Sequence, residues 1–230
     1  MDRTVLALDC ATEYCSVSLL VNGKVFHRIE QVGNQHSGVI LPWIDALIGE
    51  AGIVPSDIDG VIFGAGPGSF TGVRIACGVA QGLAWGIDAP VLPLCNLQAA
   101  AWPALKEGAD VVAVVNDARM SECYGAIYEC VDGQVKTRVA PMLLKPEAVA
   151  AWARENGASC VLGTGAKAYE IENLPQSRHT HSDANDMLAL WQANAAQFED
   201  QWVKPALASP LYVRNRVALT IKEREQGERL

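Results

Sequence analysis

The segment TVLALDCATEYCSVSLLVNGKV, residues 4–25, returns in outline as DVVAVVNDARMSECYGAIYECVDGQV, residues 110–135. In each copy an apolar run ends at an aspartate, Asp9 or Asp117, and a polar turn leads into a second apolar run that closes at Asn-Gly or Asp-Gly. Such pairs are a strong signal for a tight β-hairpin. Although the halves share no useful identity, the pattern predicts a structural duplication whose halves each open with antiparallel strands.

A glycine-rich segment, VIFGAGPGSFTGVRIACGVAQGLAWG, occupies residues 61–86 and predicts a buried strand, a tight turn and a helix. It lacks both the lysine of a Walker phosphate loop and the G-x-G-x-x-G spacing of a dinucleotide site. Two interpretations stay open at Gly66, Gly68, Ser69 and Thr71. Free N–H groups at the helix start can hold an anion, or the glycines only turn the chain while Ser69 or Thr71 caps the helix.

Two predicted helices are apolar on more than one side: residues 37–52 and the helix that follows the Gly-Pro-Gly turn. In the second, Gly78, Gly82 and Gly86 recur every four residues, a spacing that lets another backbone approach closely. Helices of this kind are buried on both sides, either against a partner or under their own chain. The predicted partner interface comprises Val39, Ile40, Trp43, Ile44, Leu47, Ile48, Ile75, Gly78, Val79, Gly82 and Leu83.

Composition narrows the class of protein. The chain has 230 residues, half of them hydrophobic, and a net charge of −8, which argues against a protein that holds nucleic acid on its own. Its seven cysteines form no C-x-x-C pair, so we expect reduced core thiols. The sequence shows no secretory signal and no uninterrupted membrane span, and we expect a cytoplasmic protein.

The stretches DCATEYCSVSLLVNG, GAGPGSFTGVRI, NDARMSECYGAIYE and PLYVRN together closely resemble the TsaB family of the bacterial tRNA threonylcarbamoyladenosine machinery, from the first strand to about Val217. The resemblance implies a two-lobed α/β fold of the ribonuclease H-like type, as in actin, sugar kinases and heat-shock ATPases. Each lobe is then a mixed sheet with flanking helices. We expect an N-terminal lobe over residues 1–105 with the glycine-rich helix and the partner interface, a C-terminal lobe over 106–215, and a charged tail over 216–230.

The resemblance also implies a subunit that performs no catalysis itself. The catalytic paralogue, TsaD, transfers a threonylcarbamoyl group to the adenosine beside the anticodon of tRNAs that read codons beginning with A, and it carries a His-x-x-x-His metal pair. The matching stretch here, LCNLQAAAW, has Asn96 and Ala100 at those positions. Asparagine is a poor transition-metal ligand and alanine is none, and His179 and His181 do not restore the pair, so we expect no metal site.

The resemblance implies two binding partners, TsaD in a heterodimer and the ATPase TsaE. It also implies a functional link to the synthase TsaC, whose product the complex uses. The resemblance implies that tRNA is bound mainly by other subunits of the complex. It assigns no firm cofactor, and it allows ATP or ADP at the interface of the complex. Because the apolar helix faces are exposed without a partner, we expect a homodimer when the chain is alone.

In an intact kinase of this fold, two hairpin turns face the nucleotide phosphates and Mg²⁺. The stretch CATEYC lacks the glycine-rich turn that phosphates need, so we expect a degenerate pocket. Its candidate residues are Asp9, Thr12, Gly66, Gly68, Ser69, Thr71, Asp117 and Arg119. The alternative functions are an actin- or sugar-kinase-type ATPase or phosphotransferase that uses Asp9 and Asp117 with Mg²⁺, and a metalloprotease, which the missing histidine pair disfavours.

Overall fold

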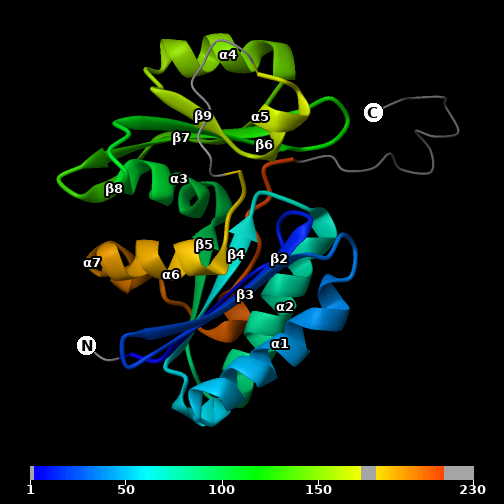
Figure 1. Ribbon diagram of the computed structural model, residues 1–230, viewed down its shortest axis with the longest axis vertical. Helices are drawn as coiled ribbons and strands as arrows, with labels where there is room; N and C mark the ends of the chain where they lie inside the picture. Colours follow the sequence, from blue (N-terminus) through cyan, green and yellow to red (C-terminus); the bar gives the residue numbers. More distant parts are fainter. Residues whose placement is uncertain (1–2, 172–179, 215–230) are drawn as a thin grey trace, which may run out of the picture.

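The computed structural model describes residues 3–171 and 180–214 and shows two lobes, each built on one mixed sheet (Figure 1). The first sheet has the strand order β3-β2-β1-β4-β5 and the second has β8-β7-β6-β9. The first contains β1 (Val5–Asp9), β2 (Tyr14–Val21), β3 (Lys24–Gln31), β4 (Gly60–Gly66) and β5 (Val91–Cys95). The second contains β6 (Val111–Asp117), β7 (Cys123–Val131), β8 (Gln134–Leu144) and β9 (Cys160–Leu162).

The two sheets confirm the predicted duplication. Strand β1 pairs antiparallel with β2 and parallel with β4, and β6 pairs in the same two ways with β7 and β9. Both hairpins turn at the predicted pairs: φ is 49° and 76° at Asn22 and Gly23, and 52° and 76° at Asp132 and Gly133. Positive φ at both central residues is the geometry that matches the twist of paired strands.

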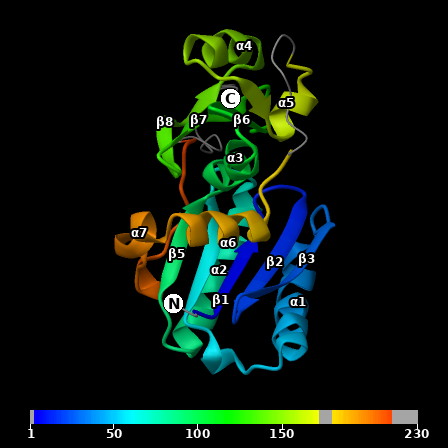
Figure 2. The same cartoon turned by 60° about the vertical axis from the view of Figure 1, so that its left-hand side comes forward.

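Helices cover both sheets. They are α1 (His36–Ala51), α2 (Phe70–Gly86), α3 (Asn96–Lys106), α4 (Pro146–Glu155), α5 (Thr164–Ala168), α6 (Ala184–Ala193) and α7 (Ala195–Phe198), with short 3₁₀ turns η1 (Pro55–Asp57), η2 (Glu199–Gln201) and η3 (Pro205–Leu207). Helices α1 and α2 pack on one face of the first sheet, and α4 and α5 pack on the outer face of the second. Helices α3 and α6 lie on the inner faces, where one apolar core joins the lobes (Figure 2).

The end of the described chain returns to the first lobe, which corrects the expected boundaries. Helix α6 packs on β1, β2 and β4, and η3 packs on α2. The backbone of Val203 pairs with that of Val91 at the edge of β5, with N···O distances of 2.8 and 2.9 Å. Helix α3, expected in the first lobe, contacts β6 as well. The segment 184–208 is thus part of the first lobe in space, and the expected tail over 216–230 lies outside the described residues.

All seven cysteines lie in the described chain as free thiols, four of them buried. Cys10 and Cys15 place their sulfur atoms 3.9 Å apart at the ends of β1 and β2. Among the residues that the structure describes, no helix is both long enough and apolar enough to cross a membrane.

The N-terminus of α6 gathers charged groups where it meets β2 and β3. The Asp183 carboxylate caps the helix by accepting from the Asn185 N–H at 3.0 Å, and it contacts His27 Nε2 at 2.8 Å. Asp186, in the first turn of the helix, has its pKa raised to about 7, first by burial and then by the charge of Asp183, against the opposing effect of His27.

The raised pKa of Asp186 predicts a specific pH dependence of stability. The folded chain binds a proton below about pH 7 that the unfolded chain, with a pKa near 3.8, does not bind until lower pH. This contribution to the free energy of unfolding is therefore largest in acid and is lost as the pH rises through about 7, with a slope of at most about 1.4 kcal/mol per pH unit. Asp186→Asn should remove that slope in denaturant titrations; a variant that keeps the wild-type pH profile contradicts the assignment.

Candidate functional site

A cleft of about 870 Å³ separates the two lobes at the ends of their central strands. The first lobe lines it with the loop after β1 and the start of α2, and the second lobe lines it with the β6–β7 turn and α5. The end of β3 with the loop before α1 (Gln31, Gly33 and Asn34) and the segment after η3 contribute the rest. Six of the predicted pocket residues line this cleft: Thr12, Gly68, Ser69, Thr71, Asp117 and Arg119.

The glycine-rich turn packs closely against the loop that follows β1. A Cβ at Gly68 would lie 2.4 Å from the Ala11 carbonyl oxygen, and one at Gly72 would lie 1.8 Å from that of Cys10, so no larger residue fits without a backbone shift. The Ser69 N–H donates to the Ala11 carbonyl at 2.7 Å. Ser69 caps α2, since its Oγ accepts from the Gly72 N–H at 3.2 Å. These contacts explain why the turn contains glycine, and they place the start of α2 at the cleft.

Asp9 does not line the cleft, which corrects its predicted place in the pocket. Its side chain is 2% exposed, and one carboxylate oxygen accepts from the Ala11 N–H at 2.8 Å and from Asn96 Nδ2 at 2.6 Å. The Ser182 hydroxyl donates to the other oxygen. Asn96 is also fully used, because Nδ2 reaches the Ser182 oxygen at 3.2 Å and Oδ1 accepts from the Gly66 N–H. We call Asp9, Asn96, Ser182 and Gly66 the buried polar cluster.

The buried polar cluster has an electrostatic cost. Burial raises the pKa of Asp9, and the hydrogen bonds from Ser182, Ala11 and Asn96 oppose that shift. A carboxylate in an apolar interior is tolerated only when donors surround it in this way. Gly64 completes the enclosure, since a Cβ there would lie 2.4 Å from both Asn96 Nδ2 and Asp9 Oδ1. The carboxylate is therefore occupied by its own chain.

Asp117 does face the cleft, with most of its acceptor capacity used. Oδ1 accepts from the Arg119 N–H at 2.8 Å and from the Tyr169 hydroxyl at 3.0 Å, and Oδ2 lies 3.3 Å from the Arg119 guanidinium. Arg119 has a positive φ of 63°, as do the next two residues, so the turn is a strained left-handed one. The two aspartates that the ATPase alternative would use together with Mg²⁺ therefore differ: Asp9 is enclosed by donors of its own chain, and Asp117 is paired with Arg119.

The positions of the missing histidine pair lie in the protein interior. Asn96 belongs to the buried polar cluster, and Ala100 is fully buried in the core that joins the lobes. His181 stacks on Tyr14 with ring centroids 4.0 Å apart, while His179 lies outside the described residues. Within residues 3–171 and 180–214, no group of three or more His, Cys, Asp or Glu side chains is placed to hold a metal ion.

The predicted partner interface divides into two faces. Ile40, Ile44, Leu47 and Ile48 are buried against the chain's own first sheet, so their assignment to a partner is corrected: an all-round apolar pattern does not tell which side meets the sheet. The other seven residues lie at or near the surface of α1 and α2. We call them the outer helix face: Val39, Trp43, Ile75, Gly78, Val79, Gly82 and Leu83.

Two exposed apolar side chains near the outer helix face are absent from the predicted partner interface. Trp85, in the last turn of α2, is 71% exposed, and Leu207, on the turn η3 that packs beside α2, is 70% exposed. The position of Trp85 three residues after Gly82 was a usable signal. Nothing in the sequence placed Leu207 next to this helix, because that contact is made by a distant segment.

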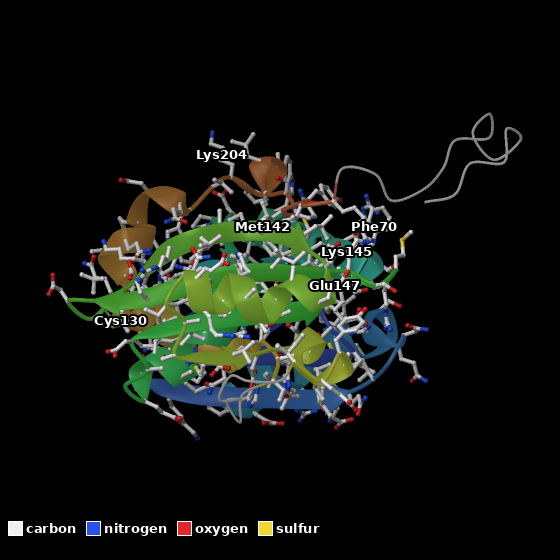
Figure 3. The ribbon with its side chains drawn as sticks, turned by 90° about the horizontal axis from the view of Figure 1, so that it is seen from above. Phe70, Cys130, Met142, Lys145, Glu147 and Lys204 are labelled. Atoms are coloured by element: carbon white, nitrogen blue, oxygen red, sulfur yellow. The ribbon has the colours of Figure 1, made fainter. Side chains whose placement is uncertain are left out.

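At the cleft rim, the final described residues tie the lobes together. The Leu211 N–H donates to the Ala65 carbonyl at 2.7 Å, and the guanidinium of Arg74 lies 3.3 Å from the centre of the Phe70 ring, with Tyr212 nearby. Arg214 then reaches the β6–β7 turn, 2.7 Å from Glu122, which also pairs with Lys145. Viewed from above, Phe70 and Lys145 lie toward the same end of the molecule, opposite Cys130 (Figure 3).

Comparison with known proteins identifies the family. The chain is 37% identical to the tRNA threonylcarbamoyladenosine biosynthesis protein TsaB of Haemophilus influenzae over 93% of this chain and 94% of that one. The chain belongs to the TsaB family. The Escherichia coli TsaB protein is 36% identical over 93% of this chain and 96% of its own length. Residues 29–210 also match the family model of TsaD, described as tRNA N6-adenosine threonylcarbamoyltransferase.

Solved structures confirm the fold of this TsaB family member. YeaZ from Pseudomonas aeruginosa superposes with a TM-score of 0.80 at 36% identity, covering 91% of this chain and 99% of that one. Another Pseudomonas aeruginosa structure, described as an uncharacterized protein with similarity to peptidase YeaZ, gives a TM-score of 0.81 at 37% identity over 92% and 100% of the two chains. The predicted mixed sheets with flanking helices and the predicted family are therefore confirmed.

The buried polar cluster predicts that Asn96 is a structural residue. Asn96→Leu should lower the free energy of unfolding by about 2–4 kcal/mol, because it removes a donor from Asp9 and leaves the Gly66 N–H unpaired in the interior. As a control, Asn156→Ala breaks a side-chain bond to the Trp152 carbonyl at the end of α4 and should cost about 1 kcal/mol or less. Chemical denaturation compares the two, and equal costs contradict the structural role.

Proposed function

We propose that the chain is a non-catalytic subunit in the biosynthesis of tRNA threonylcarbamoyladenosine, the process named in its TsaB relatives. It acts by pairing with a TsaD-type threonylcarbamoyltransferase through the outer helix face. The observation that carries this proposal is a helix surface rich in glycine and apolar groups that nothing in the described chain covers.

The glycines of α2 supply the strongest support. A Cβ at Gly78, Gly82 or Gly86 would meet nothing within 4 Å, so the packing of the described chain gives no reason for glycine at these positions. Each glycine costs about 1 kcal/mol of helix stability relative to alanine. Because Gly68 and Gly72 do have such a reason, the contrast indicates that a second backbone approaches the rest of the helix.

The apolar groups beside these glycines fit a protein partner. Val79 and Leu83 of α2 are half-buried and lie beside α1, which adds Trp43. Trp85 extends the surface with a large exposed ring. Interfaces are rich in aromatic side chains of this kind, and a soluble monomer seldom leaves them uncovered. The same surface supports self-association of the isolated chain.

The interior residues support the non-catalytic role. Asn96 and Ala100 leave no histidine pair to hold a metal, and Asp9 is enclosed by donors of its own chain. The same enclosure argues against the ATPase alternative, which needs Asp9 beside Asp117 at the phosphates. Contacts with TsaE, the link to TsaC and a nucleotide at the interface of the complex remain predictions from the sequence resemblance. A cytoplasmic location remains a prediction from the sequence pattern.

Charge placed on the outer helix face should abolish pairing and leave the fold intact. Val79→Arg puts a cation at the middle of the proposed contact, and we expect loss of co-purification with TsaD and of tRNA modification, and a shift of the isolated chain to monomer in light scattering. Val131→Arg, at the exposed end of the β7–β8 hairpin, is the matched control. Leu47→Arg should instead unfold the chain, since Leu47 is buried in its core. Wild-type pairing by Val79→Arg contradicts the proposed interface.

The helix glycines offer a test in which stability and association move in opposite directions. Gly78→Ala with Gly82→Ala should raise the free energy of unfolding by about 1 kcal/mol per site, measured in the Val79→Arg background so that pairing does not contribute. In the wild-type background the same changes should weaken pairing, because each methyl group holds the partner backbone away.

Gly49→Ala is the matched control for this pair. Gly49 lies in α1 with open space around it and outside the outer helix face, so it should give the stability gain without the loss of pairing. If the two α2 substitutions stabilise the chain and leave pairing unchanged, no backbone approaches these glycines.

A further inference from the structure

We propose that the partner interface extends beyond the outer helix face to the rim of the cleft, where Arg74 binds a carboxylate side chain of the TsaD-type partner. This contact rests on the proposed function and adds to it a charged contact beside the apolar one. Because Arg74 is not part of the outer helix face, its substitution tests the charged contact separately.

Arg74, in the first half of α2, is held against two exposed aromatic rings. Its guanidinium carbon lies 3.3 Å from the centre of the Phe70 ring and 5.2 Å from that of Tyr212. The two aromatic residues are 46% and 49% exposed, and their ring centroids are 6.3 Å apart. A guanidinium stacks through its flat face and donates in its plane. The contact with Phe70 therefore restricts the side chain and leaves its N–H groups available to an acceptor.

The guanidinium of Arg74 has no acceptor in its own chain. Among residues 3–171 and 180–214 it forms no hydrogen bond and no ion pair, and its contacts are with the two rings. Arg154 donates to the Ala150 carbonyl. The other arginines in this part of the chain each pair with a carboxylate: Arg3, Arg28, Arg119, Arg138 and Arg214. Arg74 is thus a positioned cation whose acceptor must come from another molecule.

The spacing of residues along α2 connects Arg74 to the outer helix face. Every fourth residue from the start of the helix is exposed: Phe70, Arg74, Gly78 and Gly82. Positions four apart are neighbours on a helix surface. They form one exposed stripe that begins at the cleft rim and runs into the glycines of the proposed contact. A partner backbone that approaches Gly78 closely therefore brings its side chains within reach of Arg74.

A carboxylate of a protein is the group that suits this cation. The planar guanidinium can donate two parallel hydrogen bonds to a carboxylate, and arginine and aromatic side chains are enriched in interfaces between proteins. Nucleic acid would need several free cations along its backbone. The neighbouring cations are already paired, Arg119 with Asp117 and Arg214 with Glu122. The net charge of −8 would also repel phosphates.

Charge variants of Arg74 measure the contact in the full chain. In calorimetric titrations with the TsaD-type partner, without nucleotide, Arg74→Glu should weaken pairing at least about tenfold, because it places two negative charges together. Arg74→Gln should weaken pairing less and reduce its dependence on salt, since salt screens an ion pair. Arg154→Gln is the matched control and should pair as wild type does, because α4 lies on the far side of the second lobe (Figure 1).

A chemical cross-link can identify the carboxylate of the partner. A carbodiimide joins an amine to a carboxylate that is in contact with it, and a guanidinium does not react in this way. Arg74→Lys places an amine at the same position. We therefore expect mass spectrometry to find residue 74 joined to an acidic residue of the partner. Arg154→Lys, the control, should give no cross-link to the partner.

The proposal is overturned if Arg74→Glu pairs as wild type does while Val79→Arg does not pair, in which case the apolar interface is retained without the charged contact. Wild-type pairing by both variants contradicts the proposed interface as well. The proposal also fails if Arg74→Gln leaves pairing and its salt dependence unchanged and lowers the affinity of the complex for tRNA, a result that assigns Arg74 to nucleic acid. Should Arg74→Glu fail to fold, Arg74→Gln and the cross-link decide.

Discussion

The enclosure of the Asp9 carboxylate holds the inner face of the first lobe together. Asp9 ends β1, Asn96 begins α3, Ser182 precedes α6, and Gly66 ends β4, so four elements meet at one buried carboxyl group. Its donors come from residues that are 87 and 173 positions away. Removing any one donor leaves a buried polar group partly unsatisfied, so the elements are held to a single relative arrangement. The close approach of Gly64 shows that the backbone is built around this group.

This enclosure of Asp9 also distinguishes the two halves of the duplication from each other. The halves share strand order and hairpin geometry, yet the aspartate at the end of β1 has become structural while the one at the end of β6 remains at the cleft. A pocket that in related folds would use carboxylates from both lobes is here lined by donors from both. The same scaffold has a cleft between the lobes on one side and a glycine-faced helix on the other.

Local signals in the sequence predicted the elements well. The Asn22-Gly23 and Asp132-Gly133 pairs fixed both hairpins, because positive φ at those positions is a local property. The sequence could not tell which sheet α6 covers, since ANDMLALWQA has an apolar stripe that fits either lobe. Its placement depends on contacts with β1, β2 and β4, far away in the chain. For the same reason, residues of α1 that face the sheet could not be separated from those that face outward. Asn96 was singled out only as a missing ligand, and its role depends on long-range partners that no spacing reveals.

The return of residues 184–208 to the first lobe bears on the order of events during synthesis. A domain made of one continuous segment can fold as soon as it leaves the ribosome, and domains generally do so from the N-terminus onward. Here the cover of the inner face of the first sheet is incomplete until α6 has emerged, and the edge of β5 lacks its pairing with Val203 until that residue has emerged. The second lobe, although it comes later in the sequence, has its strands and the helices α4 and α5 complete before the first lobe is finished. The nascent chain therefore carries a partly open apolar sheet from the completion of β5 at Cys95 until α6 begins at Ala184.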